Sequence, residues 1–580
     1  MIMNDLLSNR WPRPRETAVL TFLGLVGSFA MVALLGVDAN WDLFNYHYYN
    51  GFSAMTNRLN WDIAPAMRQS YFNPVLDLPT YWLISRFGTG AFTLAAAAVQ
   101  ALLIPVVWLL TYAVCGHLPG KRRQIACGLL TLIAVVSPIN LLELGTSYGD
   151  NTTALLILLS LLLVIAPQTH GVQPTLGRVF AAGLLCGVAA GLKLTNMPYC
   201  LGLAAVALYW VILPPAGCHR QSELRRALVL GAGLGFGIMA SYGPWGWYLF
   251  SMTGNPFFPQ FNHIFQSDWA PAVNFVDASF KADNFTGMLL FPFVKTSVFG
   301  NVNYLGLFDL RIAMVLILAI TVAFSLAVKK LAGLSASVSR QDRLVFATVI
   351  LFFLASYAAW LGIFSINRYA VVLEILAPIT MVALIAFIWS SPSAVWVALA
   401  LIITVVPLSM FSAPELFLRP GDRRAWNRDP LTVSPPLNLN LKSAPLIVML
   451  GGDAPTGFVV PGFPPSTRFI RVTGNLYWPH PDYRRMEDGD LSARPAVFDT
   501  VLLRRACALV TAHAGPLFAL SGDPVWLPPD RVTLDWLGLQ ATDECQPVAA
   551  GVGQVGVRMC RLERTAAAAC QQVPLRETGS

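Results

Sequence analysis

The fold of this chain is decided by "AVLTFLGLVGSFAMVALLGV" (residues 18–37), which runs directly into "DANWDLFNYHYYN" (residues 38–50). The first stretch contains no charged residue and is long enough to cross a hydrocarbon core of about 30 Å. A signal peptide has a shorter apolar core and a small-residue cleavage site after it, and no such site follows here. We therefore expect a retained membrane helix over residues 17–37 that opens into an acidic, aromatic loop.

The composition extends this expectation to most of the chain. Of the 580 residues, 55% are hydrophobic and only 12% are charged, whereas soluble domains contain about 25% charged residues. Apolar runs long enough to span a bilayer recur as far as residue 412. We predict an α-helical polytopic membrane protein with about eleven spans, near residues 17–37, 89–116, 124–141, 152–167, 178–194, 197–214, 227–250, 312–330, 344–364, 370–390 and 393–412.

The net charge of +8 does not indicate nucleic-acid binding, because the basic residues gather in short connections between spans. They lie at residues 121–123, 220–226 and 329–343, which is the positive-inside pattern of cytoplasmic loops. The pattern predicts a bacterial inner-membrane protein with a cytoplasmic N-terminus. An odd number of spans then predicts a periplasmic C-terminal part.

Two long polar segments are expected to be outer loops of a membrane domain that covers residues 1–412. In the first, residues 38–88, the stretch "YFNPVLDLPTYWLISRFG" (residues 71–88) predicts a helix lying at the membrane surface. The second, residues 251–311, is rich in Pro, Asn and Phe and predicts a cap of short helices.

The composition changes after the last apolar run. We expect a linker at 413–442, a small periplasmic α/β domain at 443–565 and a disordered tail at 566–580. The predicted strands are "APLIVML" (444–450), "STRFIRVTG" (466–474) and "ACALVTAHAG" (506–515), with a late hairpin in "VGQVGVRMCRLER" (552–564).

Cysteine use fits an oxidising compartment for the C-terminal part. Cys507, Cys545, Cys560 and Cys570 allow three pairings, of which we favour Cys545–Cys560. The other five cysteines lie in or near spans and are expected to be packing residues. No pair of cysteines has zinc-finger spacing.

The two aspartates of the first outer loop, Asp38 and Asp42, are four residues apart and would share one face of a helix. One explanation is structural: a solvated helix end, or an ion pair with Arg58 or Arg68. The functional alternative is a general base that faces an outer cavity, because carboxylates near a bilayer need a partner or a task.

Five segments, in this order, resemble the GT-C superfamily of multi-span glycosyltransferases, which use polyprenyl-phosphate sugars. "NWDLFNYHYYNGFSAMTNRL" (residues 40–59) is similar to the family's first outer loop, where an acidic residue follows the first span in a D-x-x-x-Y-H context. The remaining similar segments are "TSYGDNTTALLILL" (146–159), "AAGLLCGVAAGLKLTNMPY" (181–199), "TGNPFFPQFNHIF" (253–265) and "SINRYAVVLEILAP" (365–378).

The resemblance implies catalytic acids. The family's first acidic position falls on Asp42, and its second, at the outer start of the fourth span, falls on Asp150. Glycosyl transfer needs a base that takes a proton from the acceptor hydroxyl. We expect Asp42 in that role, then Asp38, with Asp150 supporting the acceptor or a metal.

The same reaction needs cations that hold the departing phosphate. The family's G-x-x-x-G-x-x-x-x-x-K element places Lys193 on the outer side, and Lys295, Arg311 and Arg368 are further outer cations, with Tyr369 beside Arg368. For Arg368 the alternative is simple snorkelling to lipid headgroups.

Acceptor or sugar contacts are predicted for Trp41, Tyr46, His47 and His263. The aromatic residues among them fit an interfacial belt as well as stacking on sugar rings. No cofactor is certain. A divalent metal, Mg or Mn, held by His47 or His263 with an aspartate is one alternative to an ordinary hydrogen-bonded histidine.

Two glycine-rich stretches resemble nucleotide loops only superficially. "GAGLGFG" (231–237) lies inside a span without a preceding strand, so it predicts close helix packing. "GGDAPTG" (451–457) lacks the G-K-[ST] ending of a phosphate loop and predicts a turn.

The sequence therefore predicts a glycosyltransferase, inverting by family resemblance, that acts on the periplasmic face. Its partners would be a polyprenyl-phosphate sugar donor, a cell-envelope glycan or lipid-linked acceptor, and the bilayer. The alternative in another class is a transporter or flippase of lipid-linked glycans, which would favour internal repeats and polar residues at the membrane midplane. An O-antigen-type polymerase and a non-catalytic assembly subunit are further alternatives.

Overall fold

The computed structural model divides the chain into two compact units. Unit 1 contains residues 1–35, 94–243 and 277–419, and unit 2 contains residues 36–93, 244–276 and 420–580. The structure describes residues 11–275, 280–282, 284–294, 310–331, 338–389, 391–411, 423–427, 429–436, 444–477, 480–487, 500–523, 526–550 and 556–565. Lys295 and Cys570 lie outside the described residues.

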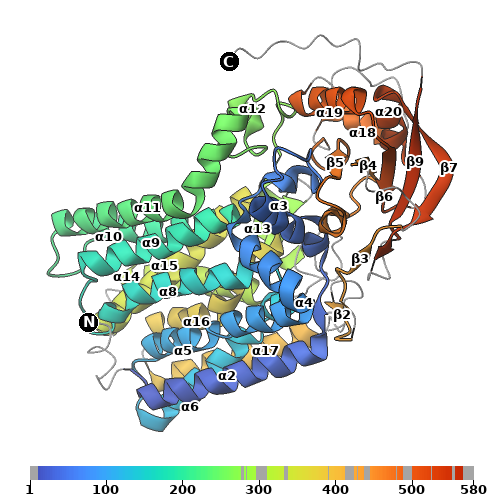
Figure 1. Ribbon diagram of the computed structural model, residues 1–580. Coiled ribbons are helices and arrows are strands. Elements are labelled where there is room, and N and C mark those ends of the chain that lie inside the picture. The colour runs from blue at the N-terminus through green and yellow to red at the C-terminus, as the bar shows by residue number, and fades with distance from the viewer. Residues whose placement is uncertain are drawn as a thin grey trace. The chain divides into compact units, whose positions relative to one another are not determined.

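Unit 1 is a bundle of helices that run side by side (Figure 1). Its elements are α2 (Pro14–Leu35), α5 (Leu103–Val114), α6 (Gly120–Val135), α7 (Pro138–Glu143), α8 (Asp150–Gln168), α9 (Leu176–Leu192), η4 (Leu194–Asn196), α10 (Met197–Ile212), α13 (Phe285–Val294), α14 (Arg311–Leu331), α15 (Arg340–Ile363), η6 (Asn367–Ala370), α16 (Val371–Ile388) and α17 (Pro392–Phe411). Two further helices, α4 (Asp77–Gln100) and α11 (Arg220–Thr253), belong partly to each unit.

The predicted membrane architecture is confirmed as a multi-span helical fold. Among the described residues, eight helical segments are long and apolar enough to cross a membrane, and each matches one of the expected spans. The expected spans at 124–141, 178–194 and 393–412 correspond to α6, α9 and α17. The first of these differs from the prediction, because α6 ends at Val135 and Pro138 starts the separate helix α7.

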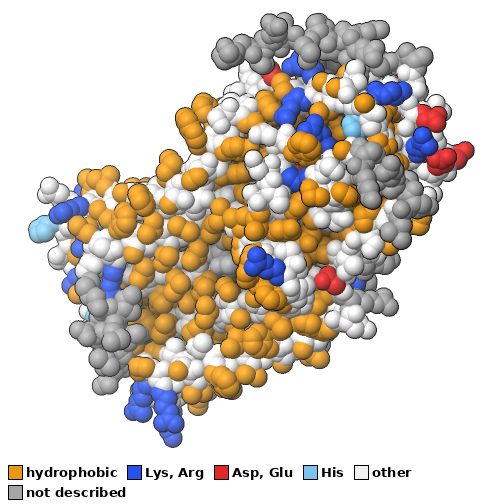
Figure 2. Space-filling model, in the orientation of Figure 1, with side chains coloured by type: hydrophobic (Ala, Val, Ile, Leu, Met, Phe, Trp, Pro, Cys, Tyr) orange, Lys and Arg blue, Asp and Glu red, His pale blue; other side chains and the backbone are white. Residues whose placement is uncertain are grey.

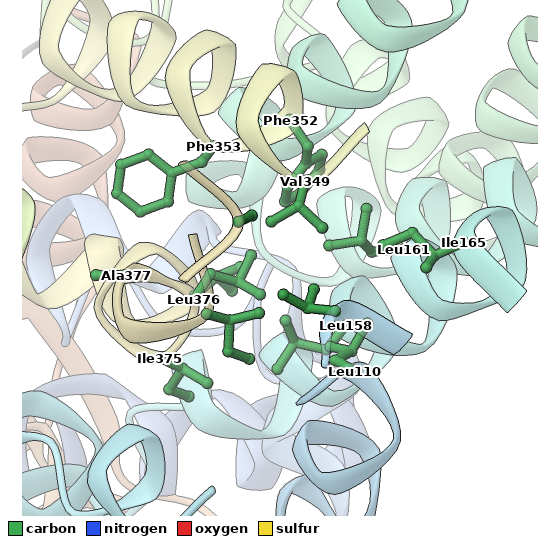
Figure 3. Close-up of a cluster of buried hydrophobic side chains, with 14 of the residues drawn as sticks. Leu110, Leu158, Leu161, Ile165, Val349, Phe352, Phe353, Ile375, Leu376 and Ala377 are labelled. Atoms are coloured by element: carbon green, nitrogen blue, oxygen red, sulfur yellow. The ribbon is translucent and has the colours of Figure 1, made fainter. Parts of the chain in front are cut away.

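The centre of unit 1 is α16, whose side chains are buried on nearly every side. A helix that is apolar all round is stable only when other helices surround it. In Figure 3 its Ile375, Leu376 and Ala377 lie with residues of α5, α8 and α15, all of them part of one core cluster. By contrast, Phe236 on α11 and Ile320 and Phe324 on α14 are mostly exposed, as lipid-facing residues would be.

Hydrophobic side chains cover most of the visible face of the helical unit (Figure 2). Helices α9 and α11 meet within this unit through glycines. A Cβ on Gly183 or Gly187 would clash with the α11 backbone, and a Cβ on Gly233 or Gly237 would clash with the backbone of α9. The prediction that the 231–237 stretch serves close helix packing is therefore confirmed.

Unit 2 is built around a five-stranded sheet with the order β5-β4-β6-β9-β7. The first three strands are parallel and the last two are antiparallel to their neighbours. Helices α18 to α20 pack beside this sheet (Figure 1). The elements of this part are β4 (Leu446–Leu450), η9 (Gly457–Gly462), β5 (Arg468–Arg471), α18 (Pro481–Glu487), α19 (Val501–Ala512), β6 (Leu517–Ser521), α20 (Pro528–Trp536), β7 (Leu539–Pro547) and β9 (Arg558–Arg564).

The first outer loop is part of the same unit. It forms β1 (Val37–Asp38), the π-helical turn η1 (Leu43–His47), α3 (Tyr48–Thr56), η2 (Met67–Tyr71) and η3 (Pro74–Leu76). Strand β1 pairs with β2 (Arg423–Arg424), and β3 (Val433–Ser434) pairs with β8 (Ala549–Ala550). Helix α12 (Asn262–Phe265) completes the unit.

The predicted strands are right at β4 and β5 and wrong at "ACALVTAHAG", which is the second half of helix α19. The predicted late hairpin at 552–564 lies partly outside the described residues, and its described part forms strand β9, which pairs antiparallel with β7. The predicted surface helix at 71–88 is helical from Asp77 and continues past a break at Gly88, whose φ of 81° only glycine adopts readily.

The predicted disulfide Cys545–Cys560 is present and joins the paired strands β7 and β9. Cys115, Cys127, Cys186 and Cys200 are buried free cysteines, and Cys218 is half-buried. These positions agree with the expectation of packing residues. The domain boundaries at 412 and 443 stay predictions, since the division into units groups residues differently.

Candidate functional site

The structure gathers the predicted site residues into two clusters, one in each unit. We call them the Asp150 cluster (Glu143, Tyr148, Asp150, Lys193, Arg368 and Tyr369, in unit 1) and the Asp42 cluster (Trp41, Asp42, Tyr46, His47, Asp77 and Asp453, in unit 2). Each is described by itself.

The Asp150 cluster lies at the ends of several helices of unit 1. Asp150 is the first residue of α8, after Gly149 in the left-handed conformation. Lys193 occupies the extended break between α9 and η4, and Arg368 belongs to η6 before α16. Because α8 and α9 are antiparallel neighbours, the start of one and the end of the other bring Asp150 and Lys193 together.

The cluster is a buried charge network. The Lys193 ammonium lies 2.5 Å from Asp150 Oδ2 and donates to the backbone oxygen of Tyr148 at 2.8 Å. The Arg368 Nε is 3.7 Å from the same carboxylate oxygen. Arg368 is 6% exposed and Asp150 is 2% exposed, so water screens these charges little.

Two aromatic rings support the cations. The Arg368 guanidinium lies 4.3 Å from the ring centre of Tyr148, and both Lys193 and Arg368 lie 5.3 Å from that of Tyr369. The Tyr369 backbone oxygen accepts a hydrogen bond of 2.6 Å from the Tyr199 hydroxyl. These contacts hold both cations in fixed positions, which favours binding of an anion over snorkelling of a mobile side chain.

Glu143 is a member of this cluster that the sequence did not single out as a site residue. Its side chain is fully buried at the end of α7. Burial, and then the negative charge of Asp150, raise the pKa of Glu143 well above its ordinary value. Around Glu143, two cations, Lys193 and Arg368, face the Asp150 carboxylate, an arrangement that suits a phosphate.

Neighbouring polar residues fix the short helix that carries Glu143. Glu374 on α16 accepts a hydrogen bond of 3.0 Å from the backbone N–H of Ile139, at the start of α7. Arg311, predicted as a phosphate contact, donates to the Val136 oxygen at the end of α6 at 3.2 Å. In this structure Arg311 thus connects α14 to the α6–α7 corner.

The basic connections and the Asp150 cluster lie at opposite ends of α8. The loop that follows Gln168 contains Pro174, whose oxygen accepts a hydrogen bond of 2.9 Å from Arg226. In the same loop a Cβ on Gly171 would touch Gln341 at the start of α15. The predicted inner loops therefore share one end of the bundle, and Asp150 begins at the other.

In unit 2, the first outer loop folds around its own polar side chains. Asp38 Oδ1 accepts hydrogen bonds from the Asn40 amide at 2.6 Å and from the Asn40 backbone N–H at 3.3 Å. Asn40 Oδ1 in turn accepts from the backbone N–H of Leu43 at 2.8 Å, which starts the helical turn η1. The Asp38 carboxylate therefore stabilises this turn through its hydrogen bonds with Asn40.

Asp42 is 4% exposed and accepts a hydrogen bond of 3.2 Å from the Tyr46 hydroxyl, one turn later on η1. The next residue, His47, holds Asp77 Oδ1 at 2.6 Å through its Nδ1. Its Nε2 is buried and has no hydrogen-bond partner among the described residues. Arg58, one of the two arginines offered as an ion-pair partner of the loop aspartates, makes its salt bridge with Asp62 at 2.8 Å.

The C-terminal sheet adds a third carboxylate, beside Asp42 and Asp77, to this cluster. Asp453 lies in the turn after β4, at the carboxyl edge of the parallel strands, where α/β proteins commonly bind ligands. Its backbone oxygen accepts from Trp41 Nε1 at 3.3 Å, and its side chain accepts from the Asn475 amide at 3.3 Å. The sequence predicted only a turn at residues 451–457. The position of this turn after a buried strand is a signal that could have identified Asp453.

Burial raises the pKa of Asp453 to about 6, and the nearby charge of Asp42 adds to the shift against the opposing effect of Arg471. Arg471 is fully buried and fixes the turn by donating to the backbone oxygens of Gly452 at 3.0 Å and Ala454 at 2.9 Å. The Asp42 cluster therefore contains one acid that titrates near neutral pH.

The other predicted contacts are not part of either cluster. His263 is exposed on α12, and no contact with Asp42 is described for it. No group of three or more His, Cys, Asp or Glu side chains in the described part of the chain could hold a metal ion. The Lys193 ammonium occupies one oxygen of the Asp150 carboxylate.

No family model and no curated protein matches this chain. Among solved structures, the chain is similar to two crystal structures of ArnT from Cupriavidus metallidurans, one bound to undecaprenyl phosphate and one in the apo state. The identities are 15% and 16%, the TM-scores are 0.44 and 0.45, and each match covers 94% of this chain and 97% of the other. A likeness at this level assigns neither a substrate nor a catalytic residue.

Proposed function

We propose that this protein is a membrane glycosyltransferase that moves a sugar from a polyprenyl-phosphate donor to a cell-envelope glycan or a lipid-linked acceptor on the periplasmic face. The observation that carries the proposal is the buried Asp150 cluster. Lys193 and Arg368 are held against one carboxylate at the end of the bundle away from the basic loops. A buried site with two fixed cations suits the phosphate of a lipid donor.

Asp42 removes the proton from the acceptor hydroxyl. The oxygen then attacks the anomeric carbon of the donor sugar, and the bond from that carbon to the phosphate oxygen breaks. The polyprenyl phosphate leaves with the electron pair, and the Lys193 ammonium and the Arg368 guanidinium stabilise its charge. The buried position of Asp42 supports this role, because the hydrogen bond from the Tyr46 hydroxyl fixes the orientation of its carboxylate.

The test is sugar transfer by the purified full-length protein from a panel of polyprenyl-phosphate sugars. We expect Asp42→Asn to lower the turnover by about 10²–10⁴-fold with unchanged thermal unfolding, as the loss of a general base does. The control is Asp268→Asn, at an aspartate of unit 2 outside both clusters. Transfer at the wild-type rate by the folded Asp42→Asn variant would exclude Asp42 as the base.

The transporter alternative predicts a different result. A flippase moves a lipid-linked glycan across the bilayer without breaking the bond between sugar and phosphate. If no donor of the panel is cleaved, but fluorescent lipid-linked glycans change leaflets in vesicles that contain the protein, the transferase proposal is wrong.

A further inference from the structure

Unit 2 contains a cavity of about 360 Å³ that the proposed function does not use. It lies between α3, the η2–η3 segment and the last turns of α11. Its volume falls within the about 300–1,000 Å³ of typical small-molecule sites. None of Trp41, Asp42, Tyr46, His47 and His263 lines it.

One wall of the cavity is aromatic. Trp245 and Tyr248, on α11, stack with ring centres 5.6 Å apart and planes at 28°. Phe72 lines the cavity from the η2–η3 segment. The Trp245 Nε1 donates to the Tyr71 backbone oxygen at 3.1 Å, and the Tyr248 hydroxyl accepts from the Asn60 amide at 2.9 Å. The polar atoms of these two residues are thus engaged by protein, which fixes the orientation of their rings.

The rest of the lining is uncharged and mixes aliphatic with polar side chains. Asn50, Asn57 and Asn73 contribute carboxamides, and among the described residues no Asp, Glu, Lys, Arg or His lines the cavity. The Asn50 amide donates to the Gln69 oxygen at 2.9 Å, whereas its Oδ1 is buried without a hydrogen-bond partner among the described residues. A buried acceptor without a partner is unfavourable unless a ligand supplies a donor.

The aromatic wall and the uncharged carboxamides together favour one class of ligand over others. A phosphate or a carboxylate would need a cation, and the lining has none. A hydrocarbon chain would leave the Asn50 oxygen without a donor, which is unfavourable in an apolar environment. A sugar ring fits both walls, because its C–H face packs on an aromatic ring and its hydroxyls pair with carboxamides.

The cavity adjoins the Asp42 cluster. The Phe72 ring packs edge-on against Tyr46 with ring centres 5.6 Å apart, and Tyr46 donates to Asp42 at 3.2 Å. On the other side, the Asn50 side chain bonds to Asp77, the partner of His47. The Phe72 and Tyr46 side chains therefore connect the cavity to Asp42.

We propose that this cavity binds one neutral sugar ring of the acceptor, with Trp245 and Phe72 on its faces and the Asn50 carboxamide on a hydroxyl. The assignment of the ring to the acceptor rests on the proposed function. Trp245 and Asn50 are binding residues here, and neither touches the reacting atoms.

The experiment uses the full-length protein in nanodiscs, because glycoside detergents would compete for the cavity. The probes are methyl pyranosides of glucose, galactose, mannose and arabinose, followed by saturation-transfer NMR. We expect at least one of them to bind saturably. Trp245→Ala should weaken that binding about tenfold, the loss expected for one aromatic contact. Trp245→Phe should retain most of it.

Trp247→Ala is the matched control. Trp247 lies two residues away on the same helix, is 70% exposed and does not line the cavity. The proposal is overturned if no pyranoside binds, or if Trp247→Ala weakens binding as much as Trp245→Ala. Quenching of Trp245 fluorescence by brominated lipid chains, measured as the difference from Trp245→Phe, would also overturn it, because a lipid chain would then occupy the cavity.

Transfer assays separate this proposal from the proposed function. Asn50→Ala and Trp245→Ala should raise the KM for the acceptor with a smaller effect on kcat, whereas Asp42→Asn should lower kcat. If the wild type transfers sugar and both cavity variants keep its KM, the cavity proposal fails alone. If pyranosides bind through Trp245 but no donor is cleaved, the sugar site remains and the proposed function fails.

Discussion

At the scale of single residues, burial separates side chains that the sequence presents as equivalent. Asp38 and Asp42 are both acidic and adjacent in the first outer loop. The structure commits Asp38 to the Asn40 turn, whereas Asp42 faces Tyr46 within a cluster of further acids. The prediction that favoured Asp42 over Asp38 is consistent with this difference, and the role of each stays to be tested.

The Asp150 cluster makes a prediction about charge balance. Lys193→Met leaves Asp150 without its nearest cation, and breaking a buried pair costs about 3–5 kcal/mol. Adding Asp150→Asn should recover much of that stability, because no unpaired carboxylate remains. Binding of the lipid phosphate should not recover.

Thermal unfolding and binding of radiolabelled polyprenyl phosphate check both parts. A double variant that binds the lipid as tightly as the wild type would show that Lys193 does not hold the phosphate. Lys121→Met, at a basic connection on the other side of the bundle, is the control and should change neither property.

Asp453 predicts a pH-dependent stability. Its pKa is raised from 3.8 to about 6 on folding. The folded protein therefore binds a proton that the unfolded chain has lost, and stability falls as the pH rises from about 4 to about 6. Asp453→Asn removes this penalty and keeps an acceptor for Asn475.

We expect the unfolding temperatures of Asp453→Asn and of the wild type to agree at pH 4. The variant should be more stable at pH 8, by at most about 3 kcal/mol. Scanning calorimetry from pH 4 to 8 measures the difference. A constant difference across this range would contradict the raised pKa.

At the scale of elements, helices and strands are predicted correctly where one hydrophobic period dominates the sequence. They are predicted wrongly where the stretch of sequence considered is too short. "ACALVTAHAG" alternates well enough to suggest a strand. The structure starts the helix earlier, at Val501, and buries Leu502, Leu503, Ala506, Cys507 and Val510. This spacing of three to four residues is the mark of an amphipathic helix, visible only when the preceding "VLLRR" is included.

The glycine contacts between α9 and α11 give a prediction with an internal control. A Cβ on Gly187 would approach the Leu234 backbone to an impossible distance, so Gly187→Val must push the two helices apart. Gly235→Val lies on α11 where nothing stands within 4 Å of the new Cβ.

We expect Gly187→Val to lower the unfolding temperature and to reduce the yield of folded protein, and Gly235→Val to have little effect. The loss should be several kcal/mol, as for overpacking against a rigid backbone. Equal stability of the two variants would show that α9 and α11 are not in close contact.

At the scale of the whole molecule, the first outer loop and the C-terminal sheet form one structural unit. The Ile63 backbone N–H donates to the Phe469 oxygen at 2.8 Å, and Arg471 donates to the Ile63 oxygen at 2.8 Å, so residue 63 extends the edge of β5. Asp62 accepts from the backbone N–H of Phe469 at 3.0 Å. Removal of the sheet would leave these groups of the loop without partners.

We therefore predict that a chain truncated after residue 419 loses sugar transfer although it retains Asp42. Limited proteolysis should cut it within residues 38–73, where the full-length protein resists. Co-expression of residues 420–580 as a separate chain should restore protection. A truncated chain with full activity would show that the sheet does not support the Asp42 loop.

The sequence by itself determined the class of the fold. A long apolar run in a bilayer is stable as a helix, because all its backbone hydrogen bonds are then made within the segment. Short basic connections set the expected topology. The helical class and the topology therefore follow from local composition. It also indicated Asp42, as a charged group beside an apolar run, whereas Asp150 and Lys193 were predicted from the resemblance of short segments to a known family.

Only the tertiary structure decided which of these groups meet. The pairing of Lys193 with Asp150, the pKa of Glu143 and the approach of Asp453 to Trp41 depend on contacts between segments far apart in the chain. The sugar-sized cavity likewise draws its walls from α3, Phe72 and α11. Burial and electrostatic environment arise from packing, and packing is a property of the folded chain rather than of any local stretch.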